Sequence, residues 1–100
     1  MGERVATLLA YGSFALETRR LFVIYGDLAC EDDKVVKIGM RIHIAFNPTF
    51  SVSETIHSIE YIVKDSIEYI GVCLKYDNLE ELAFVKALNV GDETCEIYNA

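Results

Sequence analysis

The sequence has little proline and glycine, no tryptophan and few basic residues. One proline and six glycines among 100 residues exclude collagen-like, proline-rich and low-complexity chains. Nine Lys and Arg against sixteen Asp and Glu give a net charge of −7. This balance disfavours nucleic acids and anionic membranes as partners, because binding to either depends on basic side chains that neutralise phosphates. We therefore predict no nucleic-acid partner and no membrane partner.

Motifs for the common kinds of site chemistry are also missing. Cys30, Cys73 and Cys95 form no Cys-x-x-Cys pair, so we predict three small buried side chains in a reducing compartment. No nucleophile elbow or glycine-rich oxyanion loop is present. The apolar run Val5–Ala10 is shorter than the roughly 7–15 residues of a signal-peptide core. We predict a cytoplasmic protein that is not an enzyme, with no catalytic residue, cofactor or metal.

The sequence does contain a high proportion of apolar residues in a strand-like pattern. Hydrophobic residues make up 52% of the chain, and Ile and Val alone account for 19 residues, a composition typical of β-sheets. Met40–Phe46 alternates with period two, with four large apolar residues on one face and Arg41, His43 and Ala45 on the other, which predicts a half-buried strand. Leu21–Cys30 is apolar on both faces, which predicts a central strand. Further strands are predicted at Val5–Leu16, with a bulge or bend at Gly12, at Ile67–Tyr76 and at Thr94–Tyr98.

Two segments need separate arguments. Ser53–Lys64 fits a strand in which Ile59, Tyr61 and Val63 face inward, but Ile56, Ile59 and Val63 also have helical spacing. Residues 78–88 are predicted to form a short helix, because an asparagine cap and a glutamate three residues later precede an apolar stripe. Together these elements predict a mainly all-β fold: one domain, residues 1–100, built as a small antiparallel barrel of five or six strands with one short helix.

The order of several segments resembles the second, β-barrel domain of translational GTPases of the elongation factor one alpha and elongation factor Tu type. The resemblance lies in Val36–Ile62, where a Lys-x-Gly-Met turn and a strand are followed by a polar loop and a second strand. Tyr25–Leu28 and Ile70–Val72 match strands on either side, and Glu31–Asp33 matches an acidic turn. The resemblance implies a small antiparallel β-barrel and a strand for the ambiguous segment. The chain has no phosphate-binding loop, so no GTPase domain is implied.

Three residues are candidates for contact with a ligand or partner. Arg41 and His43 share the polar face of a predicted strand, and His57 lies on the strand expected to form a hairpin with it. The two histidines lack a third metal ligand at suitable spacing. We predict a stand-alone, non-catalytic binding or protein-interaction module whose partner is either another protein or a second copy of the chain. The alternative is a structural or oligomer-forming regulatory subunit; an RNA-binding protein or an enzyme is less favoured.

Overall fold

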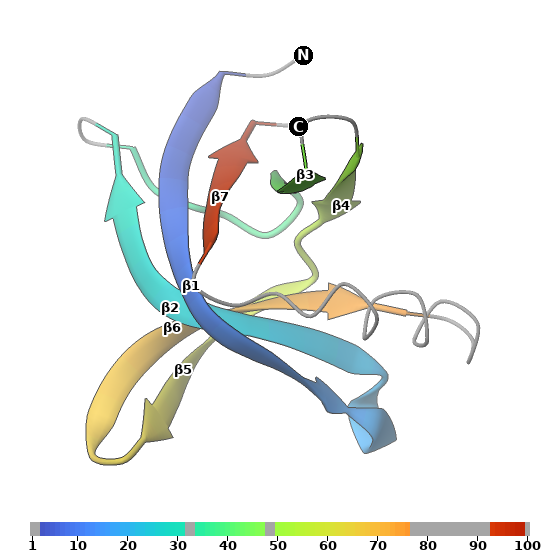
Figure 1. Cartoon of the computed structure of the whole chain (residues 1–100), viewed down its shortest axis with the longest axis vertical. Coiled ribbons are helices and arrows are strands. Elements are labelled where there is room, and N and C mark those ends of the chain that lie inside the picture. The colour runs from blue at the N-terminus through green and yellow to red at the C-terminus, as the bar shows by residue number, and fades with distance from the viewer. Residues whose placement is uncertain (1–2, 32–33, 48–49, 77–92, 100) are drawn as a thin grey trace.

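The computed structural model describes residues 3–31, 34–47, 50–76 and 93–99. Seven strands in this part of the chain form one antiparallel sheet (Figure 1). The strands are β1 (Arg4–Leu16), β2 (Leu21–Cys30), β3 (Arg41–Asn47), β4 (Phe50–Thr55), β5 (Ser58–Lys64), β6 (Ile67–Lys75) and β7 (Glu93–Tyr98). Their order across the sheet is β4-β3-β7-β1-β2-β6-β5. The predicted mainly all-β class is confirmed, whereas the predicted count of five or six strands is wrong.

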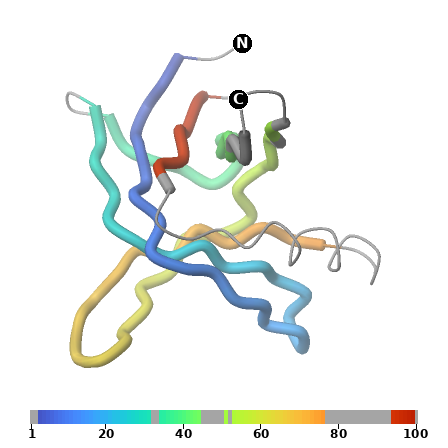
Figure 2. The backbone as a smooth tube through the Cα atoms, viewed as in Figure 1, coloured from blue at the N-terminus to red at the C-terminus, as the bar shows by residue number. Residues whose placement is uncertain are grey.

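The seventh strand arises because the predicted strand Ser53–Lys64 is broken in the middle. β4 and β5 lie at opposite ends of the sheet, yet only Ile56 and His57 separate them in sequence. The backbone N–H of Ile56 donates to the carbonyl of Met40 at 2.8 Å, whereas that of His57 donates to the carbonyl of Cys73 at 2.8 Å. The chain thus passes from one end of the sheet to the other within two residues. The sheet therefore curls into a half-barrel, as the backbone trace shows (Figure 2).

The pairing of β1 with β2 contains the predicted irregularity. The register shifts between Ala10 and Gly12, which is the effect of an extra residue in one strand. A short 3-10 turn, η1 (Glu17–Arg19), leads from β1 to β2 and ends at Arg20, whose φ is 54°. β2 lies between β1 and β6, as its two apolar faces predicted.

The larger hydrophobic core lies inside the curl and draws residues from five strands. Its buried members are Val5, Ala6, Leu8, Ala10, Phe22, Ile24, Val36, Ile42, Ile44, Ile56, Val72, Leu74, Cys95 and Ile97. A smaller buried cluster, Leu21, Val23 and Cys73, lies on the opposite face of β2 and β6. Both faces of the β2–β6 pair are therefore apolar, and their burial is the main term that stabilises this half of the sheet.

Other predictions have mixed outcomes. Cys73 and Cys95 are buried as predicted, whereas Cys30 is exposed, because it ends β2 where β6 no longer lies alongside. The predicted helix near residues 78–88 lies outside the described residues. No helix in the described part of the chain is long and apolar enough to cross a membrane.

Candidate functional site

The candidate site is a cleft that opens where β2 and β6 separate. The two strands pair from Leu21 opposite Lys75 to Gly26 opposite Ile70, and no pair joins them beyond that point. β2 continues alongside β1 as far as Cys30, while β6 continues alongside β5. In Figure 1 the two hairpins diverge from this fork, with β2 running upward and the β5–β6 hairpin running downward.

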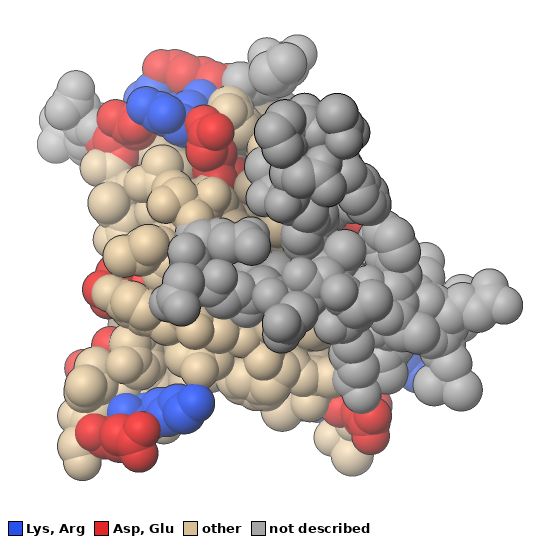
Figure 3. All heavy atoms as spheres, viewed as in Figure 1, with Lys and Arg blue, Asp and Glu red and all other residues tan. Residues whose placement is uncertain are grey.

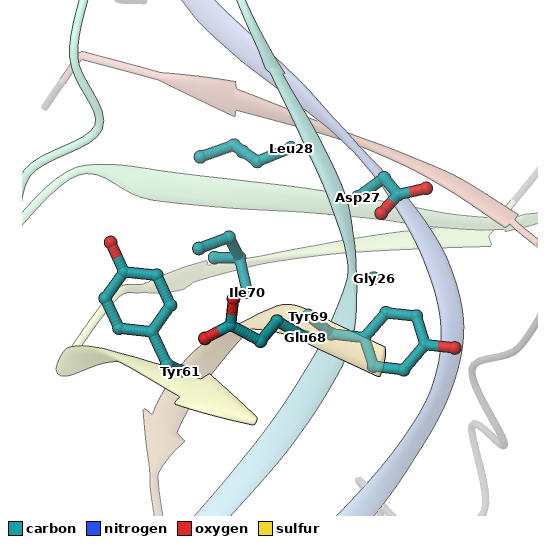
Figure 4. Close-up of a pocket in the computed structure, with 7 residues that line it drawn as sticks. All are labelled: Gly26, Asp27, Leu28, Tyr61, Glu68, Tyr69 and Ile70. Atoms are coloured by element: carbon teal, nitrogen blue, oxygen red, sulfur yellow. The ribbon is translucent and has the colours of Figure 1, made fainter. Parts of the chain in front are cut away.

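The cleft has a volume of about 360 Å³ and a mixed lining. Leu28, Tyr61 and Ile70 provide an apolar side, and Figure 4 shows all three on the same side of β2. Asp27 and Tyr69 lie on the other side (Figure 4). The seven lining residues are Gly26, Asp27, Leu28, Tyr61, Glu68, Tyr69 and Ile70.

One wall of the cleft extends into an exposed apolar hairpin tip. Tyr61 is 78% exposed, Val63 67% and Ile67 54%. The sequence predicted that Tyr61 and Val63 face inward together with Ile59. They do share a face with Ile59, but only Ile59 packs against the core. The outer half of β5 extends past the core. The alternating apolar residues there lie on one face of the strand, but no described residue covers that face.

Aromatic rings support the far side of the cleft. The ring centroid of Tyr69 lies 5.5 Å from that of Tyr11 and 5.5 Å from that of Tyr25. The centroid of Phe14 lies 6.0 Å from that of Tyr25. These separations fall in the range of favourable aromatic pairs. The Tyr11 hydroxyl donates to Asp27 Oδ2 at 2.6 Å, which fixes that carboxylate at the rim.

Charges around the cleft are held by specific partners, with one exception. Lys64 Nζ donates to the Tyr25 hydroxyl at 3.0 Å, and this hydrogen bond raises the pKa of the ammonium. Glu60 lies on the same face of β5 as Lys64, and hydrogen bonds from Arg19 lower the pKa of its carboxylate. The side chain of Glu68, which lies in the paired strand β6, makes no hydrogen bond or ion pair with any described residue. Its carboxylate at the cleft is therefore available to a cation from outside the described chain.

The predicted candidates Arg41, His43 and His57 do not form one site. Arg41 donates to Thr55 Oγ1 at 3.2 Å and to the Ser53 carbonyl at 2.8 Å. The Nδ1 atom of His43 lies 3.1 Å from Ser53 Oγ. These two residues thus hold β3 against β4, on the face opposite the core.

The sequence predicts His57 on the strand that pairs with the strand of His43, whereas His57 lies between β4 (Phe50–Thr55) and β5 (Ser58–Lys64). His43 lies opposite Ser53 in the β3–β4 hairpin, and His57 follows Ser53 by four residues. Its exposed side chain sits instead at the corner between β4 and β5.

The described residues offer little for nucleophilic or metal chemistry. Burial raises the pKa of the Cys73 thiol, which disfavours the reactive thiolate. No group of three or more His, Cys, Asp or Glu in the described ranges is placed to hold a metal ion. What the geometry offers is a mostly apolar cleft with the acidic residues Asp27 and Glu68 in its lining.

One residue near the cleft, Gly26, stands out in the sequence although it does not belong to an alternating pattern. Gly26 interrupts the apolar run of β2, and a glycine within a strand often marks the close approach of another backbone. The carbonyl oxygen of Leu9 would lie 1.9 Å from a Cβ atom at this position. The glycine thus indicates the close contact between β2 and β1, whereas the end of the β2–β6 pairing and the side chains of the cleft wall have no such signal in the sequence.

Comparison with known proteins returns no relative. No protein-family model, no curated protein and no solved structure matches the chain. The resemblance to the barrel domain of translational GTPases therefore stays a prediction from sequence.

Proposed function

We propose that the chain is a non-catalytic protein-interaction module that binds an extended segment of another protein in the cleft between β2 and β6. The observation that carries this proposal is the fork at Gly26 and Ile70. Beyond it, Asp27–Cys30 of β2 and Ile67–Tyr69 of β6 each have a neighbouring strand on one side only among the described residues. Such edges offer backbone hydrogen bonds to an added strand.

The lining defines the chemistry of the bound segment. Leu28, Ile70 and the ring of Tyr61 favour an apolar or aromatic side chain. Glu68 has no charged partner among the described residues and favours a lysine or arginine beside that apolar side chain. An extended segment with one apolar and one basic residue on neighbouring positions would satisfy both.

The surface charge supports a protein partner over a nucleic acid. The net charge is −7, and on the face seen in Figure 3 the basic residues lie beside acidic ones instead of forming a stripe. Arg4, for example, contacts Glu31 at 2.9 Å and Glu96 at 3.4 Å. Basic side chains engaged in this way contribute little attraction for phosphates.

A selection from a phage-displayed random peptide library tests the proposal. We expect enriched peptides to pair an apolar residue with a basic one and to bind wild-type protein in a fluorescence titration. Tyr61→Ser and Glu68→Gln should each weaken the enriched peptides about tenfold, because each removes one wall group. Val35→Ser, which changes a 63% exposed apolar residue outside the cleft lining, is the matched control.

Two results would contradict the proposal. One is a library that yields no enriched sequence. The other is a set of peptides that binds Tyr61→Ser and Glu68→Gln as tightly as it binds wild-type protein.

A further inference from the structure

The free edge of β5 is a second surface, which shares Tyr61 with the cleft. β5 ends the sheet, and its only neighbour among the described strands is β6. The seven pairs from Ser58 to Lys64 run without a register shift, and the strand contains no proline. Edge strands usually carry a bulge, a proline or a cover that prevents pairing with another chain. β5 has neither a bulge nor a proline, and it leaves Tyr61 and Val63 exposed.

We propose that this edge pairs with β5 of a second copy of the chain, antiparallel and centred on Ile62. The proposal goes beyond the cleft function, because it uses the side of the β5–β6 hairpin that faces away from β2. The two copies would be related by a two-fold axis perpendicular to the sheet, which is the commonest symmetry of protein dimers. The two half-barrels would then share one continuous sheet.

Symmetry limits the registers that are allowed. A two-fold axis perpendicular to the sheet keeps every side chain on its own face. Residues that oppose each other must therefore come from the same face, and the centre of the pairing must fall on a residue. In the exposed half of β5 the centre can fall on Tyr61, Ile62 or Val63, and a centre on Val63 would set Tyr61 opposite Asp65, beyond the end of the strand.

The register centred on Ile62 is self-complementary in charge. It places Glu60 of each copy opposite Lys64 of the other, so that two opposite-charge pairs form across the axis. It also places Tyr61 opposite Val63 twice, which is an aromatic and β-branched pair of the kind that stabilises sheets. Centring on Tyr61 would instead place Glu60 opposite Ile62 and leave both charges without a cross-strand partner.

In the single chain both charged side chains reach inward over β6. Glu60 accepts hydrogen bonds from Arg19 and Cys73, and Lys64 Nζ donates to Tyr25 of β2. Pairing across the edge therefore requires each side chain to turn outward and to exchange these partners for the opposite charge of the second copy. Pairing would also cover Tyr61 and Val63, the two most exposed apolar residues of β5.

Charge reversal tested by sedimentation equilibrium decides the proposal. Wild-type protein should form a reversible dimer. Glu60→Lys and Lys64→Glu should each weaken dimerisation at least about tenfold, because each change sets like charges opposite each other at two places. An equimolar mixture of the two variants, and the double variant that carries both changes, should recover the wild-type dimer because opposite charges face each other again.

Controls separate this effect from loss of the fold and from the cleft function. Arg19→Ala removes the partner of Glu60 within the chain but leaves the edge intact, so it should keep the dimer, as should Lys37→Glu elsewhere on the surface. Circular dichroism checks each variant for the wild-type spectrum. The single variants keep every residue of the cleft lining, Tyr61 included, so peptides selected for the cleft should still bind them, and either proposal can fail alone. A wild-type protein that is monomeric at its highest soluble concentration would overturn the dimer, as would single variants that dimerise normally or a mixture that stays monomeric.

Discussion

Gly26 lies directly opposite Ile70, and this pair is the last that joins β2 to β6. The same glycine faces the backbone of β1, because a Cβ atom at this position would lie 1.9 Å from the carbonyl oxygen of Leu9. The fork that opens the cleft therefore forms at the point where three strands are in close contact.

Gly26→Ala should destabilise the fold strongly. The added methyl group would overlap the Leu9 carbonyl, which belongs to the backbone and cannot rotate away. We expect a loss of about 2 kcal/mol in the free energy of unfolding, measured by urea denaturation. Gly12→Ala is the comparison: its methyl would lie 2.6 Å from the hydroxyl and 2.8 Å from Cζ of Tyr25, so a side chain and not the backbone must shift, and the loss should be smaller. Equal stability losses in the two variants would contradict this prediction.

Gly39→Val should destabilise through backbone strain alone. Gly39 has a φ of 96°, and no atom lies within 4 Å of a Cβ built there. A clash therefore cannot account for a loss, which should be about 1 kcal/mol or more in the free energy of unfolding. Gly39→Asn should lose less, because asparagine adopts positive φ more readily than valine does. Unchanged melting temperatures for both variants would refute the strain argument.

Stability should fall in acid partly through Glu96. The Tyr98 hydroxyl, which donates to this carboxylate at 2.8 Å, and nearby Arg4 lower the pKa of Glu96 in the folded chain. The unfolded chain therefore binds the proton more readily. The contribution is fully present above the ordinary glutamate pKa and is lost as the pH falls through the lower folded value.

Denaturation of wild-type protein and Tyr98→Phe at several pH values tests this linkage. The stability difference between the two should be largest near neutral pH and should shrink as Glu96 becomes protonated. Tyr61→Phe, which changes an exposed hydroxyl without a described partner, should differ from wild-type protein by the same amount at every pH. A Tyr98→Phe difference that is independent of pH would count against the role of Glu96.

Thiol labelling should distinguish the three cysteines. Cys30 is exposed whereas Cys73 and Cys95 are buried, and burial raises the pKa of Cys73 further. Native protein should therefore react rapidly at one thiol with an aromatic disulfide reagent, and denatured protein at all three. Cys30→Ser should remove the rapid phase. Rapid reaction of a second thiol in that variant would show that the buried positions open readily.

Transfer RNA and random single-stranded oligonucleotides should not bind at micromolar protein. Repulsion between phosphates and a chain of charge −7 outweighs stacking on the exposed Tyr61 ring. Fluorescence anisotropy measures this directly. Micromolar binding that weakens with added salt would contradict it and would favour an RNA-binding function.

The sequence predicts the strands well where one face is buried. β3 is the clearest case, because Ile42 and Ile44 are buried as its alternation requires. The break between β4 and β5 could not be predicted, because it falls at Ile56 and His57 and neither residue is a glycine or a proline. It depends on backbone hydrogen bonds to two residues that are distant in sequence, Met40 just before β3 and Cys73 in β6.

The candidate site was harder to predict than the fold. Alternation tells which residues share a face but not whether anything covers that face, so Tyr61 and Val63 were expected in the core. The cleft itself forms where the pairing of β2 with β6 ends. The extent of that pairing depends on contacts between strands that are distant in sequence, so the sequence pattern of either strand alone does not give it. The polar residues that stood out in sequence, Arg41 and His43, instead hold neighbouring strands together.

The position of β7 between β1 and β3 has a consequence for the timing of folding. Arg4 pairs with Tyr98, and the backbone N–H of Asn99 donates to the carbonyl of Glu3 at 3.0 Å. During synthesis, β1 and β2 can form a hairpin early, but β3 and β4 have no strand to join them to β1 until β7 has left the ribosome. Until then β1 carries an unpaired edge, so the nascent chain should be more prone to aggregation before β7 emerges than after it.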